Sequence, residues 1–264
     1  MSSDPVFHAD LPDPLPVRGE SFLLDGPEGR HAAAVRRIRI GEPVVLADGA
    51  GRAISGPVVA AGKQTITVEV AEQRVESPPA VRFVVAQAIA KGDRGERAVE
   101  LLTEVGASEI VPWQAARSIV RWSGERGSKA LARWRSTARE SAKQSRRLWV
   151  PTVTEPVDTG GLTARIAVAD VALLLHEGAT SALAEIALPP VGEVLLVVGP
   201  EGGLTADELG VLTAAGGRPT RLTPHVLRTS TAGVVACAGL MLRDVTQTRA
   251  SFTRHAGDTP SVTS

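Results

Sequence analysis

The chain has 264 residues, of which 43% are apolar and 22% charged, and its 29 basic residues balance 29 acidic ones. This composition excludes a disordered chain, and the single cysteine, Cys237, excludes both a disulfide framework and a cysteine-based zinc cluster within one chain. No apolar run reaches the roughly 18 residues that cross a bilayer, residues 1–13 lack the features of a secretory signal, and the five histidines show no paired spacing of metal ligands. We therefore expect a cytoplasmic protein without a metal site.

The zero net charge conceals a strongly basic segment. Residues 113–150 contain ten basic and two acidic side chains, which gives this segment a charge of +8. Only four of the 29 basic residues are lysines, and an arginine can bind a phosphate through two parallel hydrogen bonds. Arginine-rich codon usage is sufficient to explain the excess of arginine, but the local charge favours an anionic partner. A second basic cluster near the N-terminus contains Arg36, Arg37 and Arg39.

Residues 1–75 are predicted to form a small β-barrel. Three apolar or alternating stretches are typical of strands and are separated by glycine-containing turns. They are residues 43–47, 53–59 and 65–70. A short helix is predicted over 31–40, with Arg36 and Arg39 on one face.

Ser77-Pro78-Pro79 is the clearest linker, because two consecutive prolines interrupt any periodicity. Residues 76–248 are then predicted to form an α/β domain. A strand, a helix and a strand follow one another at 81–86, 93–105 and 110–111, which is the pattern of a βαβ unit and hence of a parallel sheet. The basic segment is predicted to contain a long helix over 127–147.

The last third repeats the alternation of strands and helices. Continuous apolar runs at 171–175 and 194–198 are typical of strands buried on both faces. Thr205 and Glu208 have the spacing of a capping box at the start of a helix. The remaining predicted elements are a helix over 205–212, a strand over 220–222, a helix over 230–243 and a disordered tail over 249–264.

Three loops that follow predicted strands contain the residues best suited to ligand binding. They are Gly199-Pro200-Glu201-Gly202-Gly203-Leu204, the stretch 222–232 and His176-Glu177-Gly178-Ala179. Ligands of open parallel sheets bind beyond the carboxyl ends of the strands, and glycines allow the backbone to approach a ligand. The first loop is neither a Walker loop nor a dinucleotide fingerprint, and alone it fits a tight turn as well as a ligand loop. The convergence of three such loops favours one shared crevice.

Two of these loops resemble the signature motifs of the bacterial 16S rRNA uracil-N3 methyltransferases (the RsmE family), which belong to the SPOUT methyltransferases. The motifs are Gly199-Pro200-Glu201-Gly202-Gly203 and Leu227-Arg228-Thr229-Ser230-Thr231-Ala232. Further similarities extend to about Val245. They comprise Lys91-Gly92, Glu100, Glu104-Val105-Gly106, Arg117-Ser118, Gln144-Ser145-Arg146, Val150-Pro151 and an Arg-x-x-Arg element at Arg36 and Arg39. The combination is highly specific, although no single motif is.

The resemblance implies an N-terminal PUA-like β-barrel, a C-terminal SPOUT-type parallel sheet with a trefoil knot, and a homodimer. It also implies S-adenosyl-L-methionine as cofactor and 16S rRNA, within the small ribosomal subunit, as substrate. By position, the cofactor pocket would contain Leu175, His176, Gly199, Glu201, Gly202, Leu222, Val226, Leu227, Arg228 and Ala232. The residues expected to contact RNA are Arg36, Arg39, Arg117, Arg139 and Arg146.

Arg228 is the expected catalytic residue, because a guanidinium can stabilise the charge that develops on the uracil oxygens as N3 loses its proton. No general base is assigned: His176 and His225 lie in suitable loops, but loop histidines more often only cap backbone groups. The family usually has Glu where Ser230 stands, and its usual arginine and aromatics near the N-terminus are reduced here to Phe7. Ribose 2′-O-methylation and a non-catalytic RNA-binding role in assembly remain the alternatives.

Overall fold

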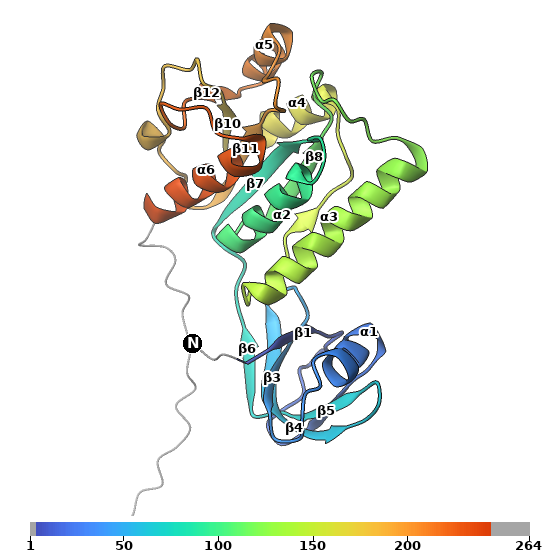
Figure 1. The fold of residues 1–264 in the computed structure, drawn as a ribbon. Coiled ribbons are helices and arrows are strands. Elements are labelled where there is room, and N and C mark those ends of the chain that lie inside the picture. Colours follow the sequence, from blue (N-terminus) through green and yellow to red (C-terminus); the bar gives the residue numbers. More distant parts are fainter. Residues whose placement is uncertain (1–3, 244–264) are drawn as a thin grey trace, which may run out of the picture.

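A computed structural model describes residues 4–243, which form two sheets stacked end to end (Figure 1). The first sheet contains six strands in the order β1-β3-β4-β5-β2, with β6 paired to β4. They are β1 (Val6–His8), β2 (Ser21–Leu24), β3 (Pro43–Ala47), β4 (Arg52–Ala61), β5 (Ile66–Glu69) and β6 (Glu72–Val75). A register shift between Val58 and Ala60 lets β4 bend, so that the sheet wraps around a core that includes Phe7, Leu46 and Ile66.

The predicted helix over 31–40 is wrong in its bounds. Helix α1 (Gly26–Arg30) begins earlier, with Pro27 in its first turn, where the fixed φ of proline favours a helix. It continues into a π-helix, η1 (His31–Val35), which ends before Arg36.

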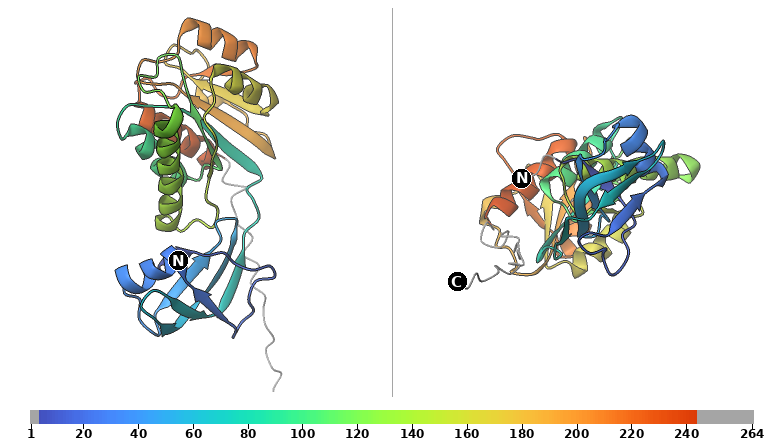
Figure 2. Two further views of the ribbon diagram at one scale, coloured as in Figure 1. Left: turned by 90° about the vertical axis from the view of Figure 1, so that its right-hand side faces the viewer. Right: turned by 90° about the horizontal axis from the view of Figure 1, so that it is seen from below.

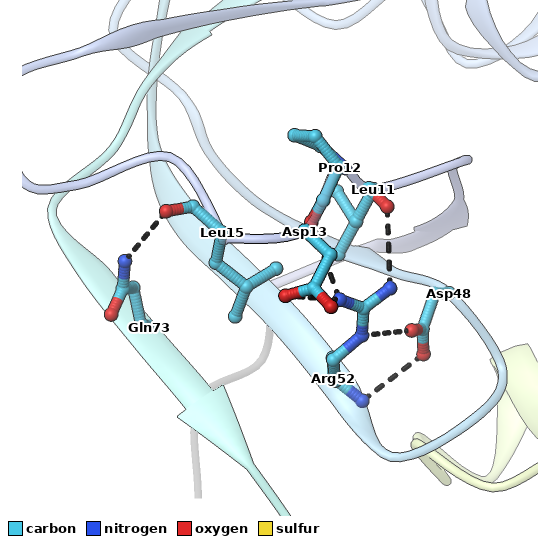
Figure 3. A network of polar contacts seen from close by, with 7 residues as sticks. All are labelled: Leu11, Pro12, Asp13, Leu15, Asp48, Arg52 and Gln73. Atoms are coloured by element: carbon cyan, nitrogen blue, oxygen red, sulfur yellow. Dashed lines mark hydrogen bonds and ion pairs between the residues drawn. The ribbon is translucent and has the colours of Figure 1, made fainter.

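The segment between β1 and β2 is tied to the barrel by a polar network around Arg52 (Figure 3). The Arg52 guanidinium donates to Asp48 Oδ2 at 2.7 Å and to the carbonyls of Leu11 and Pro12 at 3.2 and 3.3 Å. Burial alone would raise the pKa of Asp48, but hydrogen bonds from the amide of Ala50 and from Arg52 lower it below its ordinary value. The network therefore holds a segment that has few apolar anchors of its own.

The second sheet contains six strands in the order β12-β10-β11-β7-β8-β9, and every pair is parallel, as predicted. They are β7 (Val81–Ala88), β8 (Glu109–Trp113), β9 (Thr152–Val153), β10 (Val171–Leu175), β11 (Gly192–Val198) and β12 (Arg218–Thr220). The strand predicted over 220–222 instead spans residues 218–220, because the residues after Thr220 lie in a loop. The buried strand 171–175 is confirmed residue for residue.

Helices cover both faces of this sheet (Figures 1 and 2). Helices α2 (Arg94–Val105), α3 (Gly124–Gln144) and α6 (Thr229–Arg243) share one core with the sheet, and α4 (Thr159–Val168) and α5 (Ala206–Ala214) share the other. The capping box of Thr205 and Glu208 at the start of α5 is confirmed. None of the helices within residues 4–243 is both long and apolar enough to cross a membrane.

The region between β10 and β11 contacts the chain that leads into α6. A short 3₁₀ helix, η2 (Leu183–Glu185), packs against α6, and Ala182 forms a bridge with Arg221. Helix α6 also packs against α2. The resemblance implies a trefoil knot in this C-terminal domain. Residues 244–264, which include the predicted tail, lie outside the described residues.

The C-terminal end of α3 fixes the two sheets relative to each other. The buried ammonium of Lys143 pairs with Glu28 of α1 at 2.9 Å and with Glu140 at 2.8 Å. Burial alone would lower the pKa of Lys143, but these two carboxylates raise it. His8 of β1 contacts the carbonyl of Arg139 at 3.2 Å. Both sheets therefore contribute to a shared polar junction.

Candidate active site

The three loops predicted to converge do meet at one end of the second sheet. Strands β12, β10 and β11 are neighbours, so their carboxyl ends lie side by side. The amide of His176 donates to the carbonyl of Thr220 at 3.1 Å, which links the loops after β10 and β12. The hydroxyl of Thr229 donates to the carbonyl of Gly199 at 2.8 Å, which links the start of α6 to the loop after β11.

A buried glutamine extends this connection to a fourth strand. Gln87, at the end of β7, is fully buried, and its Nε2 donates to Thr229 Oγ1 at 2.9 Å and to the carbonyl of Ala88 at 3.3 Å. Its Oε1 has no hydrogen-bond partner within residues 4–243. A buried amide oxygen without a hydrogen-bond partner destabilises the folded state. The hydrogen bonds from Gln87 to Thr229 and from Thr229 to Gly199 thus connect β7, the start of α6 and the loop after β11. This pair of hydrogen bonds is called the tether below.

The glycine-rich loop after β11 is held from two sides by arginines. Arg94, at the start of α2, pairs with Glu201 at 2.8 Å, and Arg117 donates to the carbonyls of Gly202 and Leu204 at 2.8 and 3.4 Å. Burial alone would raise the pKa of Glu201, but backbone amides and Arg94 lower it. Glu201 therefore remains a carboxylate that anchors the loop.

The loop that carries Arg117 is itself rigidly anchored. The buried carboxylate of Glu208 accepts hydrogen bonds from the amide of Ala116 at 2.6 Å and from the amide of Thr205 at 3.0 Å. Gln114 donates to the carbonyl of Val120 at 3.0 Å and accepts from the amide of Trp122 at 3.0 Å. The loop that carries Arg117 is consequently held in place beside the glycine-rich loop.

The site has an apolar wall. Leu175, Leu222 and Ala232 come from three different segments, are partly buried, and pack against the same core. Leu227 is partly buried, whereas Val226 is 78% exposed. An apolar wall beside loops rich in backbone donors and acceptors is the combination that a purine ring needs. The wall therefore suits a planar apolar part of a ligand.

The two candidate histidines make local contacts. His176 Nδ1 accepts from the amide of Gly178 at 3.1 Å, and the carbonyl of His225 accepts the hydroxyl of Thr223. The carbonyl of Arg228 accepts the amides of Thr231 and Ala232 at 2.9 and 3.0 Å, while its side chain is exposed beside the site. Ser230, where the family usually has Glu, is buried.

The arginines expected to contact RNA fall into two groups. Arg36 and Arg146 line one cavity of about 140 Å³ at the junction between the sheets, whereas Arg117 lies at the glycine-rich loop. Arg39, in the loop after η1, and Arg139, in the C-terminal part of α3, are both exposed. Much of the positive charge of residues 113–150 is paired with carboxylates or carbonyls of the protein itself. Lys129, Arg133 and Arg135 pair with carboxylates, and Arg147 donates to the carbonyls of Thr103 and Ala107.

Gln87 and Arg94 were not predicted as parts of the site, and Thr229 was named only as a member of the loop 222–232 and its motif. Gln87 is a polar residue that follows the apolar run Phe83–Ala86 of β7, and that interruption could have marked it. The partners of Arg94 and Thr229 lie 107 and 30 residues away, so no local pattern could have paired them. Within residues 4–243, no group of three or more His, Cys, Asp or Glu side chains is arranged to hold a metal ion.

Comparison with known proteins agrees with this architecture. Residues 76–241 match the model of the RNA methyltransferase domain family, and residues 24–71 match that of the RNA methyltransferase PUA domain. The fold and site therefore define an RNA methyltransferase with a PUA domain.

Comparison with individual relatives identifies a family within the RNA methyltransferases. The chain is 45% identical over 228 residues to ribosomal RNA small subunit methyltransferase E of Mycobacterium tuberculosis, which covers 85% of this chain and 87% of the relative. The crystal structure of such an enzyme from Neisseria gonorrhoeae, bound to S-adenosyl methionine, matches with a TM-score of 0.77 at 27% identity, over 91% of this chain and 98% of that one. A putative methyltransferase from Legionella pneumophila with bound SAM gives 0.80 at 26% identity, over 92% and 98%. The chain belongs to the ribosomal RNA small subunit methyltransferase E family.

Proposed function

We propose that this protein transfers the methyl group of S-adenosylmethionine to N3 of a uridine in 16S rRNA. In this proposal, residues 76–248 form the methyltransferase domain and residues 1–75 form an RNA-binding domain. The observation that carries the proposal is the tether of Gln87, Thr229 and Gly199, which joins three segments beside an apolar wall. The relatives named for small-subunit rRNA methylation, and the neighbours with bound cofactor, support the choice of substrate and cofactor.

The cofactor, when bound, supplies an electrophilic methyl carbon, to which uracil N3 forms a bond as the carbon–sulfur bond breaks. Leu175, Leu222 and Ala232 would contact its adenine ring, and the loop of Gly199 and Gly202 would bring backbone groups close to it. The tether and the two arginines that hold the glycine-rich loop preorganise this surface, so less ordering is needed on binding.

Arg228 would act on the substrate. N3 of uridine must lose a proton before it can attack, and negative charge then develops on the flanking uracil oxygens. The guanidinium of Arg228 offers two donors for that charge. Its carbonyl starts α6 by accepting amides of the first turn, which fixes the backbone from which the side chain extends.

We further propose that the protein is a cytoplasmic homodimer that acts on the small ribosomal subunit. Val235 and Leu242 are seven residues apart on α6, hence on one face, and are 39% and 72% exposed. Two exposed apolar side chains on one face of α6 support a subunit interface there. Light scattering of the purified protein would distinguish a dimer from a monomer.

Methyl transfer in vitro tests the proposed activity. Small ribosomal subunits from a strain that lacks the protein would be incubated with purified enzyme and radiolabelled S-adenosylmethionine, and the rRNA would be digested to nucleosides. Label in N3-methyluridine is the expected result. Label in a 2′-O-methylated nucleoside would support the ribose alternative, and absence of both label and cofactor binding would support a non-catalytic role.

A further inference from the structure

The buried carboxylate of Glu208 has a contact that the capping of α5 does not require. In a capping box, a glutamate in the first turn accepts the amide of the N-cap residue, which accounts for the bond from the amide of Thr205 to Oε2 at 3.0 Å. The other oxygen, Oε1, accepts the amide of Ala116 at 2.6 Å, from a loop 92 positions away in the chain. Oε1 also lies 3.5 Å from the hydroxyl of Thr159 at the start of α4. The bond from Ala116 therefore serves a purpose other than capping.

This bond closes a ring that includes the second half of the glycine-rich loop. The residue after Ala116 is Arg117, whose Nη1 donates to the carbonyls of Gly202 and Leu204 at 2.8 and 3.4 Å. The residue after Leu204 is the N-cap of α5, and its amide donates to Glu208. The ring thus runs from the carboxylate through the loop of Arg117 to the glycine-rich loop and back. The carbonyl of Gly202 is therefore held in place by Glu208 as well as by Arg117.

A carboxylate is the side chain that this position requires. The groups that contact its two oxygens are all donors, namely two backbone amides and two hydroxyls. An ionised carboxylate offers only acceptors, whereas a glutamine would turn an NH₂ group toward one of the two amides. Because Glu208 is only 5% exposed, water has little access to replace the lost bond. Glu208→Gln would therefore open the ring at one amide while it preserves the shape of the side chain.

We infer that Glu208 is a positioning residue for S-adenosylmethionine, and that it acts through Arg117 on the glycine-rich loop. The ring orders this loop before the cofactor binds, so less conformational entropy is lost on binding. Glu201 in the first half of the loop is anchored separately, by Arg94 at 2.8 Å. This inference rests on the proposed function, because it takes S-adenosylmethionine as the ligand of the loop.

Hydrogen exchange of the cofactor-free protein tests the ring itself. In Glu208→Gln, amides within residues 115–118 and 201–205 should exchange about 5-fold faster than in the wild type, because a bond that connects the two segments is lost. In Arg117→Ala, the increase should be confined to residues 201–205, since the bond from Ala116 to Glu208 remains. Unchanged exchange within 201–205 in Glu208→Gln, or an equal increase over the whole chain, would overturn the inference.

Titration calorimetry measures the consequence for the cofactor. Glu208→Gln should raise the Kd for S-adenosylmethionine by about 5-fold, as Arg117→Ala should. The single-turnover rate at saturating cofactor should stay within about twofold of the wild type, because bound cofactor restores the order of the loop. If Glu208 acts through Arg117, the double variant should raise Kd by no more than about 10-fold, whereas two independent effects would multiply to about 25-fold. A 25-fold rise would overturn the proposed route through Arg117.

Two further variants separate positioning from helix stability and from charge. Asp158→Ala removes the N-cap of α4, where the side chain accepts the amide of Gly161 at 2.8 Å, and should lower Tm by about 2–4 °C with unchanged Kd. Glu208→Asp keeps the negative charge but is one methylene shorter, so it should weaken cofactor binding as Glu208→Gln does. An equal rise in Kd for Asp158→Ala, or wild-type affinity for Glu208→Asp, would overturn the inference. Failure of the wild-type protein to bind S-adenosylmethionine would instead overturn the proposed function.

Discussion

Thr229→Val is the most direct perturbation of the tether at the floor of the site. Valine has nearly the shape of threonine but lacks the hydroxyl, which accepts from Gln87 at 2.9 Å and donates to the carbonyl of Gly199 at 2.8 Å. Gln87 is fully buried, and its Nε2 would keep only the carbonyl of Ala88 at 3.3 Å. Loss of two largely buried hydrogen bonds, at about 1 kcal/mol each, should cost about 2 kcal/mol of unfolding free energy. For a domain of this size, that corresponds to a decrease of about 4–8 °C in Tm.

The same change should affect cofactor binding. Without the hydroxyl, the loop of Gly199 loses its connection to α6, so part of its order must be gained on binding. We expect the Kd for S-adenosylmethionine, measured by titration calorimetry, to rise by about 10-fold, or about 1.4 kcal/mol.

Thr231→Val is the matched control. The hydroxyl of Thr231 lies on the same turn of α6 but donates at 3.1 Å to the carbonyl of Arg228 in a more exposed setting. Its loss should cost no more than about 0.5 kcal/mol. If Thr229→Val and Thr231→Val had the same Tm and the same cofactor affinity, the tether would not organise the site and the reasoning would be refuted.

Three further changes test individual residues. Gly202→Val adds a branched side chain that faces Arg117, so the fold should survive while cofactor affinity decreases by about 10-fold; unchanged affinity in calorimetry would remove Gly202 from the pocket. Arg117→Ala removes two hydrogen bonds to the glycine-rich loop and should raise the cofactor Kd by about 5-fold, whereas Arg121→Ala, on the same loop, should not; equal effects would show that Arg117 does not position this loop. Arg228→Ala should lower the single-turnover rate of methyl transfer by about 100-fold, or roughly 2.7 kcal/mol, with little change in cofactor affinity; a rate near wild type at saturating substrate would exclude a catalytic role.

Buried parallel strands were the most predictable part of the fold. The run at 171–175 has apolar side chains at every position, because both faces of the sheet are covered, and no helix pattern competes with it. Helix α4 was missed because its first turn contains Gly160 and Gly161, which lower helix propensity. The helix near residue 31 was misplaced because its course depends on a π-turn and on the burial of Ile38, which are tertiary effects.

Some parts of the candidate site could also be predicted from the sequence, and others could not. The three strand exits could be predicted, since parallel strands end at one edge and each exit has distinctive residues. Arg117 was expected to contact RNA, yet its guanidinium binds the carbonyl of Gly202, and only the fold brings these residues, 85 positions apart, together. The left-handed conformations of Arg37 and Arg146 have no local signal, because arginine is not a residue that sequence patterns associate with positive φ.

Nucleoside analysis of 16S rRNA tests the proposed methylation of uridine N3 in the cell. Mass spectrometry would compare rRNA from a strain that lacks the protein with rRNA from the same strain complemented by the wild-type gene or by Arg228→Ala. N3-methyluridine should disappear from 16S rRNA in the deletion strain, return with the wild type, and return poorly with Arg228→Ala. Retention of N3-methyluridine in the deletion strain, or loss of a different modified nucleoside, would contradict the proposed methylation.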